Sequence, residues 1–250
     1  MAEHFLISCE HGGNRLPRRY RPIFRGLEPL LQTHRGFDAG ALGMARDLAK
    51  ALSAPLFVAT TSRLLIDLNR SVGHPRLYSE ATQYAPLELR REILERYYLN
   101  YRNRVEACIA GALARGGRVI HISSHSFTPV LDGRIRNADI GLLYDPDRAA
   151  ELELCRRWQA SLKAHAPELQ IRRNYPYAGR SDGFTAYLRR QFPNEAYLGI
   201  ELEINQKHVF EGSRHWRALR RIVIESLRQP GSAGLFLQQA VEQVEVARGE

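Results

Sequence analysis

The sequence predicts an α/β domain in which helices cover both faces of a mainly parallel sheet. Two observations carry this prediction. Short apolar runs alternate with amphipathic helical segments along the chain, and no internal repeat, low-complexity linker or break in composition interrupts them. The chain has 250 residues, 44% of them hydrophobic, which is enough for one sizeable core. We therefore expect residues 1–250 to form a single domain.

Six segments are expected to be strands, because they are short, apolar and bounded by turn-forming residues. They are residues 5–9, 55–60, 119–125, 140–144, 169–173 and 196–205. Residues 15–36 read as a loop with a short helix near 28–32, and residues 130–139 as a polar turn.

Five longer helices are expected, at residues 38–49, 86–114, 145–165, 185–191 and 211–229. In the first, Asp38 is well placed as the N-cap. The second has apolar residues at i, i+4 spacing, namely Leu89, Ile93, Tyr97, Tyr101, Val105 and Ile109.

Composition and charge exclude several classes of function. The net charge is +9, and the excess is nearly all arginine, but the arginines are dispersed and no nucleic-acid-binding motif accompanies them, so nucleic acid is a disfavoured partner. No apolar run is long enough to span a membrane. Only three cysteines occur, widely spaced, and the first residues do not resemble a signal peptide. These features predict a cytoplasmic protein with reduced thiols.

Three residues that can bind a metal stand at the ends of predicted elements. His11 follows the first strand, His125 closes the strand at 119–125, and Asp38 opens the first helix. Such positions can meet at one edge of an α/β sheet, where ligands bind. Two histidines and a carboxylate with one open position form a common catalytic zinc set. The simpler interpretation leaves Asp38 as a helix cap and His11 as part of a glycine turn.

The last predicted strand carries two carboxylates on one face. Alternation places Glu201, Glu203 and Asn205 together, opposite three aliphatic residues. Either this is the solvated face of an edge strand, or it lines a cleft in which one carboxylate is a general base.

Two further groups are candidates for substrate binding. Arg63, Asp67, Asn69 and Arg70 follow one another closely, and arginine is suited to a bidentate carboxylate clamp. A salt-bridged surface turn would give the same pattern. The loops that carry Arg134 and Arg136, and residues 174–179 including Tyr177, are placed to cover the site.

Nucleophilic catalysis is less well supported. Ser123, Ser124 and Ser126 lie near histidines, but the chain lacks the G-x-S-x-G elbow. Cys9 lies two residues before His11 within an apolar run, which favours a buried and inert thiol.

Six segments between residue 7 and about residue 210 together form a specific pattern, although each is weak alone. They are Glu10–Asn14 with Leu16-Pro17, His34–Ala41, Ser62–Arg70, His125–Pro129, Asn174–Tyr177 and Glu203-Ile204. In these residues and in their order, the chain resembles the N-formylglutamate amidohydrolase family, which is distantly similar to zinc carboxypeptidases.

The resemblance implies a three-layer α/β sandwich of the phosphorylase/hydrolase-like, zinc-carboxypeptidase-like kind, with a mixed and mostly parallel sheet. It also implies a zinc-dependent amidohydrolase acting on an N-acyl amino acid such as N-formylglutamate. His11 and His125 would be zinc ligands, with Asp38 as the third and Glu10 as its rival. Glu203 matches the general base.

The resemblance further implies that Asn69 and Arg70 grip a substrate carboxylate, with Arg63, Arg136 and Tyr177 as additional substrate-binding candidates. Two differences from the family pattern stand out. Asn14 replaces the carboxylate that carboxypeptidases carry three residues after the first histidine, and Asn205 replaces an arginine after the last strand, which bears on substrate choice.

The alternative hypotheses are a zinc hydrolase of another N-acyl amino acid or of a peptide C-terminus, and a non-catalytic binder of small anionic ligands or nucleic acid. The sequence leaves the oligomeric state open.

Overall fold

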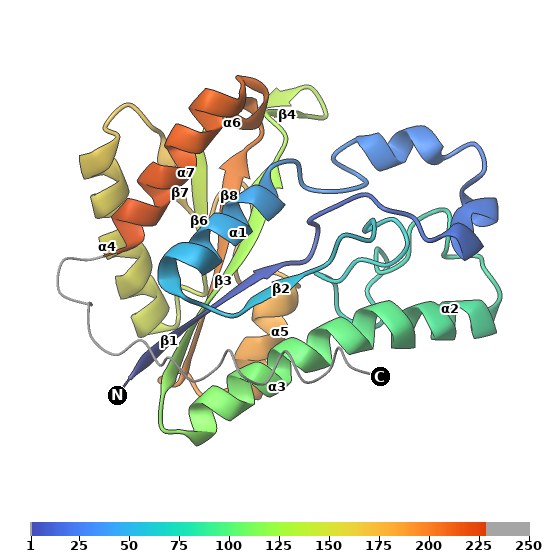
Figure 1. The fold of residues 1–250 in the computed structure, drawn as a ribbon, viewed down its shortest axis with the longest axis horizontal. Helices are drawn as coiled ribbons and strands as arrows, with labels where there is room; N and C mark the ends of the chain where they lie inside the picture. Colours follow the sequence, from blue (N-terminus) through green and yellow to red (C-terminus); the bar gives the residue numbers. More distant parts are fainter. Residues whose placement is uncertain (1, 229–250) are drawn as a thin grey trace.

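The computed structural model describes residues 2–228 and contains a six-stranded sheet between two layers of helices (Figure 1). The strand order is β2–β1–β3–β8–β6–β7, and every neighbouring pair is parallel except β6 and β8. The prediction of a three-layer α/β fold with a mixed, mostly parallel sheet is confirmed. The bounds are β1 Glu3–Cys9, β2 Leu56–Val58, β3 Arg118–Phe127, β6 Ile140–Leu143, β7 Ile171–Arg173 and β8 Tyr197–Asn205.

The helices divide between the two faces of the sheet. One face packs against α1 (Ala41–Leu52), α4 (Ala149–His165) and α7 (Ser213–Leu227), with the short α6 (Lys207–Phe210) before α7 (Figure 1). The other face packs against α2 (Leu87–Ile93), η3 (Leu94–Leu99), α3 (Asn100–Ala114) and α5 (Phe184–Gln191), together with the 3₁₀ helices η1 (Arg18–Phe24) and η2 (Glu28–Gln32). Because both faces are covered, β8 is buried along its whole length.

The central position of β8 decides how its carboxylates are interpreted. It lies between β3 and β6, so the alternative of a solvated edge strand is wrong. Glu203 is the register partner of His125 on the parallel strand β3. The carboxyl ends of β1, β3 and β8 therefore bring His11, His125 and Glu203 to the same edge of the sheet.

The helical segment from residue 87 to 114 is continuous but contains one π-helical stretch, η3. The predicted i, i+4 pattern fails there: Tyr98 is buried and Tyr97 is only partly buried. The buried positions Ile93 and Tyr98 are five residues apart, which matches the wider π turn. The π stretch shifts the buried face by one residue and returns to the predicted pattern at Tyr101.

Three local predictions need correction. Residues 130–139 are not only a turn, since β4 (Val130–Leu131) and β5 (Arg134–Ile135) form a hairpin across Asp132-Gly133, both with positive φ as in a type I′ turn. The helix expected at 211–229 is α7, which begins at Ser213 and ends at Leu227; the short α6 at Lys207–Phe210 precedes it and was not expected, and residue 229 lies outside the described residues. The helix η1 was not predicted.

Asp38 is not the N-cap of α1, which is a correction with consequences for the site. The cap position is Gly40, whose φ of 83° is left-handed, and no side chain caps the helix. The Asp38 carboxylate instead contacts His125 and Arg63. The Asp38 carboxylate therefore pairs with charged side chains and does not accept a hydrogen bond from the first turn of α1.

The three cysteines form no disulfide in the described residues. All three thiols are free, and Cys9 is fully buried, which raises its pKa well above the usual value. No helix within residues 2–228 is both long enough and apolar enough to cross a bilayer.

A fully buried histidine, His121, links the two central strands to β1. Its Nε2 lies 2.7 Å from Ser8 Oγ and its Nδ1 lies 2.7 Å from Tyr197 Oη. Burial lowers the pKa of His121 to about 4, against the smaller opposing effect of Glu10. A neutral imidazole therefore belongs to the folded state.

This histidine should make the protein less stable in mild acid. Its pKa is 6.5 unfolded and about 4 folded, so the unfolded chain binds the extra proton between these values and stability falls as pH falls through that window. From pH 7 to pH 5 the His121 contribution should be roughly 2 kcal/mol. Urea unfolding at both pH values should show a steeper loss for wild type than for His121→Gln. Parallel losses in the two proteins would contradict the assignment.

Candidate active site

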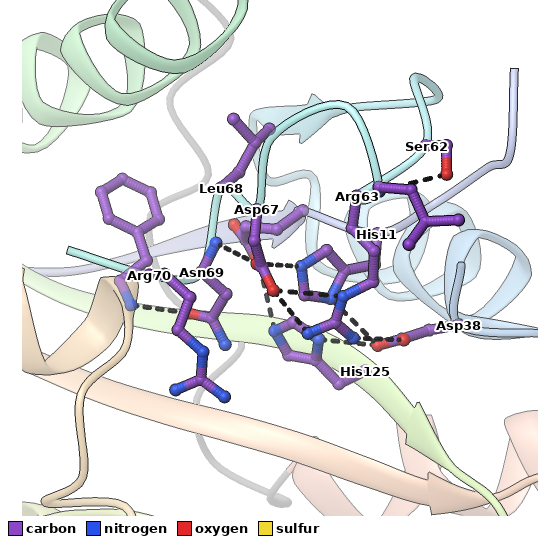
Figure 2. Close-up of polar contacts among 12 residues, drawn as sticks. His11, Asp38, Ser62, Arg63, Asp67, Leu68, Asn69, Arg70 and His125 are labelled. Atoms are coloured by element: carbon purple, nitrogen blue, oxygen red, sulfur yellow. Dashed lines mark hydrogen bonds and ion pairs between the residues drawn. The ribbon is translucent and has the colours of Figure 1, made fainter. Parts of the chain in front are cut away.

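Three buried side chains from separate parts of the chain meet at the carboxyl edge of the sheet. His11 follows β1, Asp38 lies before α1, and His125 lies near the end of β3. The Oδ2 atom of Asp38 is 2.8 Å from His125 Nδ1 and 3.4 Å from His11 Nδ1 (Figure 2). All three potential ligand atoms lie within 4.8 Å of one another, so the group can hold a metal ion.

Local sequence explains how His11 reaches this position. The chain turns sharply after β1 at Gly12-Gly13, whose backbone packs against the segment that follows β2. A side chain on Gly13 would collide with the backbone of Thr60. The two glycines therefore allow the close approach that directs the imidazole toward Asp38.

In both histidines the inner nitrogen, Nδ1, faces Asp38, and the outer nitrogen, Nε2, contacts a second acid. His11 Nε2 donates to Asp67 Oδ1 at 2.7 Å. His125 Nε2 lies 3.2 Å from Glu10 Oε2 and 3.0 Å from Ser123 Oγ. A hydrogen bond of this kind fixes the ring and leaves the inner nitrogen free to ligate, as at histidine–metal sites generally. The geometry favours Asp38 over Glu10 as the third inner group.

Arg63 binds the inner and outer acids together. Its guanidinium donates to Asp38 Oδ1 at 3.3 Å and to Asp67 Oδ2 at 2.7 Å (Figure 2). These charges raise the pKa of Arg63, although its burial opposes them. Arg63 therefore holds one carboxylate beside each side of His11, and its side chain is 24% exposed.

Three acids of the cluster, Asp38, Asp67 and Glu10, have lowered pKa values although they are buried. Burial alone would raise the pKa of Asp38, but His11, His125 and Arg63 outweigh it and hold that pKa well below its usual range. The pKa of Asp67 is lowered by Arg63 and His11, and that of Glu10 by His125, again against burial. Buried ionised carboxylates need compensating cations. The donor set of two imidazoles and a carboxylate, with buried acids around it, fits a divalent metal.

Glu203 is the remaining acid of the cluster and differs from the others. Its Oε2 atom is buried and is without a hydrogen-bond partner within the described residues. Burial raises the pKa of Glu203 to about 8, with His125 opposing and Asp38 adding to the shift. A buried carboxylate with a free oxygen beside a histidine pair is placed to accept a proton.

The predicted substrate-binding residues lie in the loops around this edge. The segment that carries Asn69 and Arg70 is fixed against the N-terminus of α5, because Asn69 Oδ1 accepts from the Phe184 amide at 2.6 Å (Figure 2). Arg70 donates through Nη1 to Asp182 O at 2.8 Å, and its Nε is buried without a partner in the described chain.

Arg136 and Tyr177 join the two other loops. Arg136 Nη1 donates to Tyr177 Oη at 3.0 Å, and the guanidinium lies 5.2 Å from the ring centroid. Asn205 Nδ2 donates to the carbonyls of Arg136 and Ala138. Asn205, where the family pattern has arginine, thus anchors the Arg136 loop. Arg134 is exposed.

Comparison with known proteins gives the family. The sequence profile described as N-formylglutamate amidohydrolase matches residues 3–210. The chain belongs to the N-formylglutamate amidohydrolase family. As a member, it is a hydrolase that acts on an amide bond, and the rival hypothesis of a non-catalytic binding protein is no longer needed.

Solved structures agree with this N-formylglutamate amidohydrolase fold. A gene product of Agrobacterium tumefaciens is 29% identical, with a TM-score of 0.74 over 89% of this chain and 88% of its own. An N-formylglutamate amidohydrolase from Ralstonia eutropha is 20% identical, with a TM-score of 0.66 over 90% of this chain and 92% of its own, and shares the fold. A search of curated proteins finds no match.

A metallo-carboxypeptidase from Burkholderia cenocepacia is 14% identical, with a TM-score of 0.38 over 90% of this chain and 55% of its own. That likeness is too weak to support an inference, so the kinship of this amidohydrolase with zinc carboxypeptidases stays a prediction.

Sequence reasoning missed the outer residues of this amidohydrolase site. Asp67 was grouped with substrate-binding residues, yet it contacts His11, and Ser123 and Tyr101 both contact Glu10. Their local patterns carry no sign of these contacts, because the partners of Asp67 and Tyr101 are 56 and 91 residues away. Only the compact cluster of polar residues at 62–70 pointed to the region.

Asp67→Asn should weaken the retention of any metal ion that His11, Asp38 and His125 hold. The amide keeps the shape of the side chain but removes the charge that orients His11, and such outer-shell changes typically cost about 10- to 100-fold in metal affinity. Competition with a chelator of known affinity measures the change. Asp182→Asn, in a nearby loop away from both histidines, is the matched control. Equal affinities for the two variants would contradict the role.

Proposed function

We propose that the protein is a zinc-dependent amidohydrolase that cleaves an N-acyl amino acid, with N-formylglutamate as the preferred substrate. One observation carries the proposal: the inner nitrogens of His11 and His125 both face Asp38, while their outer nitrogens are held by Asp67 and Glu10. Two imidazoles and a carboxylate with an open position are typical of catalytic zinc. Family membership supports the amide as the bond that is cleaved.

His11, Asp38 and His125 would hold the metal. When bound, Zn²⁺ would polarise the amide carbonyl and lower the pKa of the attacking water from about 16 toward 7. The acids around the two histidines would keep both rings oriented for this task.

Glu203 would move the proton. Its free Oε2 atom would take a proton from the attacking water and then donate it to the nitrogen of the leaving amine. Water adds to the acyl carbon, the C–N bond breaks, and N-formylglutamate yields formate and glutamate. Burial of Glu203 supports this role, since it keeps other water away from the proton that is transferred.

The arginines would choose the substrate. N-formylglutamate carries two carboxylates, and Arg70 and Arg136 lie in separate loops at the site edge. Arg70 with Asn69 would bind one carboxylate, and each charge-assisted contact is worth roughly 1.5–3 kcal/mol. Arg136, held by Tyr177 and Asn205, would meet the other. Arg63 already contacts the carboxylates of Asp38 and Asp67, so it would bind substrate only through the part of its guanidinium that is exposed.

A substrate panel tests the proposal. N-formylglutamate should give the highest kcat/KM, and N-formylglutamine should lose at least about tenfold, because it removes one charged contact. N-acetylglutamate, N-succinylglutamate and a dipeptide with C-terminal glutamate complete the panel. A higher kcat/KM for the acetyl, succinyl or peptide compound than for N-formylglutamate would support the alternative hypothesis, a zinc hydrolase of another N-acyl amino acid or of a peptide C-terminus. If the protein hydrolysed none of these compounds, the proposal would be overturned.

The small-molecule substrate follows from the family, and the other expectations remain proposals. We propose a cytoplasmic location and no nucleic-acid partner, as the sequence predicts.

A further inference from the structure

A second cluster of metal-binding side chains lies away from the candidate active site, where α6 meets α7. It consists of His208, Glu211 and His215, and we call it the α6–α7 cluster. His208 Nδ1 is 2.8 Å from His215 Nε2, and His215 Nε2 is 3.2 Å from Glu211 Oε2. The nearest ligand atoms of the three residues lie within 4.8 Å of one another.

The inner histidine of this cluster is buried and has a fixed orientation. His208 is 4% exposed, and its Nε2 lies 2.9 Å from Asp139 Oδ1. The other carboxylate oxygen of Asp139 accepts the Gln170 amide at 2.7 Å, so this acid is itself held in place. With Nε2–H donated to Asp139, the lone pair of a neutral His208 is on Nδ1 and faces His215. A carboxylate–histidine pair of this kind is the usual support of a metal-bound imidazole.

The outer members of the cluster are accessible and adjustable. The side chains of His215 and Glu211 are 42% and 49% exposed, so an ion can enter from solvent and keep an open coordination position. Metal–nitrogen bonds of about 2.05 Å in a tetrahedral site place two ligand nitrogens about 3.3 Å apart. The rings therefore need to separate by only about half an ångström, which the exposed His215 can provide.

We propose that the α6–α7 cluster is a second metal site, one that takes a divalent transition-metal ion such as Zn²⁺. Two imidazole nitrogens and one carboxylate oxygen suit zinc rather than Mg²⁺ or Ca²⁺, which prefer all-oxygen sites. The ion joins α6, which directly follows β8, to the first turn of α7. Val209 of α6 also packs against Gly40, so the ion braces the segment between Asp38 and α1.

Metal counting tests this site without reference to activity. Chelator-treated protein is dialysed against buffer containing Zn²⁺, and the ions per chain are measured by elemental analysis. His215→Ala should hold one ion fewer per chain than wild type. The control is His165→Ala, which removes an exposed histidine at the C-terminus of α4, outside the cluster, and should leave the zinc content unchanged. Circular dichroism confirms that both variants fold.

The outcome does not depend on the candidate active site. If that site also binds zinc, the counts should be two for wild type and one for His215→Ala; if it does not, they should be one and none. Glu211→Gln should weaken binding of the same ion at least about tenfold, as expected for loss of a charged ligand. Equal zinc content in wild type and His215→Ala would overturn the proposal.

Discussion

Glu203→Gln should lose most of its turnover while the protein stays folded and keeps its metal. The amide fills the same buried space but cannot accept a proton from water, and loss of a general base typically lowers the rate by about 10²- to 10⁴-fold. Because Glu203 Oε2 makes no hydrogen bond within the described residues, the substitution removes no hydrogen bond from that oxygen. The measurement is kcat for N-formylglutamate together with zinc content.

Glu201→Gln is the matched control for this prediction. Glu201 lies on the same face of β8, two residues earlier, but its Oε1 accepts a hydrogen bond from Thr185 Oγ1 at 2.8 Å. It should keep most of its turnover. If the two variants lost turnover equally, or if Glu203→Gln also lost its zinc, Glu203 would be a structural residue rather than the base.

Removal of the metal should abolish hydrolysis of N-formylglutamate, and Zn²⁺ should restore it. Without the ion, nothing would polarise the amide carbonyl or lower the pKa of the attacking water, and a carboxylate such as Glu203 is too weak a base to deprotonate ordinary water efficiently. Two nitrogen donors and one carboxylate favour Zn²⁺ or Co²⁺ over Mg²⁺, so Mg²⁺ should not restore turnover. Full activity after exhaustive chelation would end the zinc proposal.

Counting the catalytic ion requires a protein that lacks the α6–α7 cluster. In the His215→Ala background, any ion that remains belongs to the candidate active site. Adding His125→Ala to that background should remove it, whereas adding Glu203→Gln should not. The comparison of His125→Ala with Glu203→Gln distinguishes a metal ligand from a residue that takes part in proton transfer without binding the metal.

Local patterns were sufficient for most secondary structure. Strands with flanking turn residues, such as 5–9 and 140–144, were found because alternation or an apolar run reports directly on burial. The π-helical stretch at 94–99 was missed, since a single extra residue in one turn leaves no compositional mark. The Asp132-Gly133 hairpin carried a readable signal, because an aspartate–glycine pair favours the type I′ turn found there.

The candidate site was only partly readable in this way. Spacing alone could identify His11, Asp38 and His125 as chemically suitable, and the family pattern singled them out. It could not distinguish the helix-cap interpretation of Asp38 from the ligand interpretation, because both predict an acid before a helix. The structure excludes the helix cap, because Gly40 is the N-cap of α1 and the Asp38 carboxylate contacts His125; its role as a metal ligand stays a proposal.

The sequence by itself determined the α/β class, the alternation of strands and helices, and the presence of histidines and acids at the ends of the strands. Only the tertiary structure decided that β8 is central, that Asp67 and Glu10 support the histidines, and that His208 and His215 meet. The physical reason is the separation of the contacting residues along the sequence. Periodicity reports on burial a few residues at a time, whereas these contacts depend on the order of the strands and on backbone turns that bring distant segments within hydrogen-bond distance.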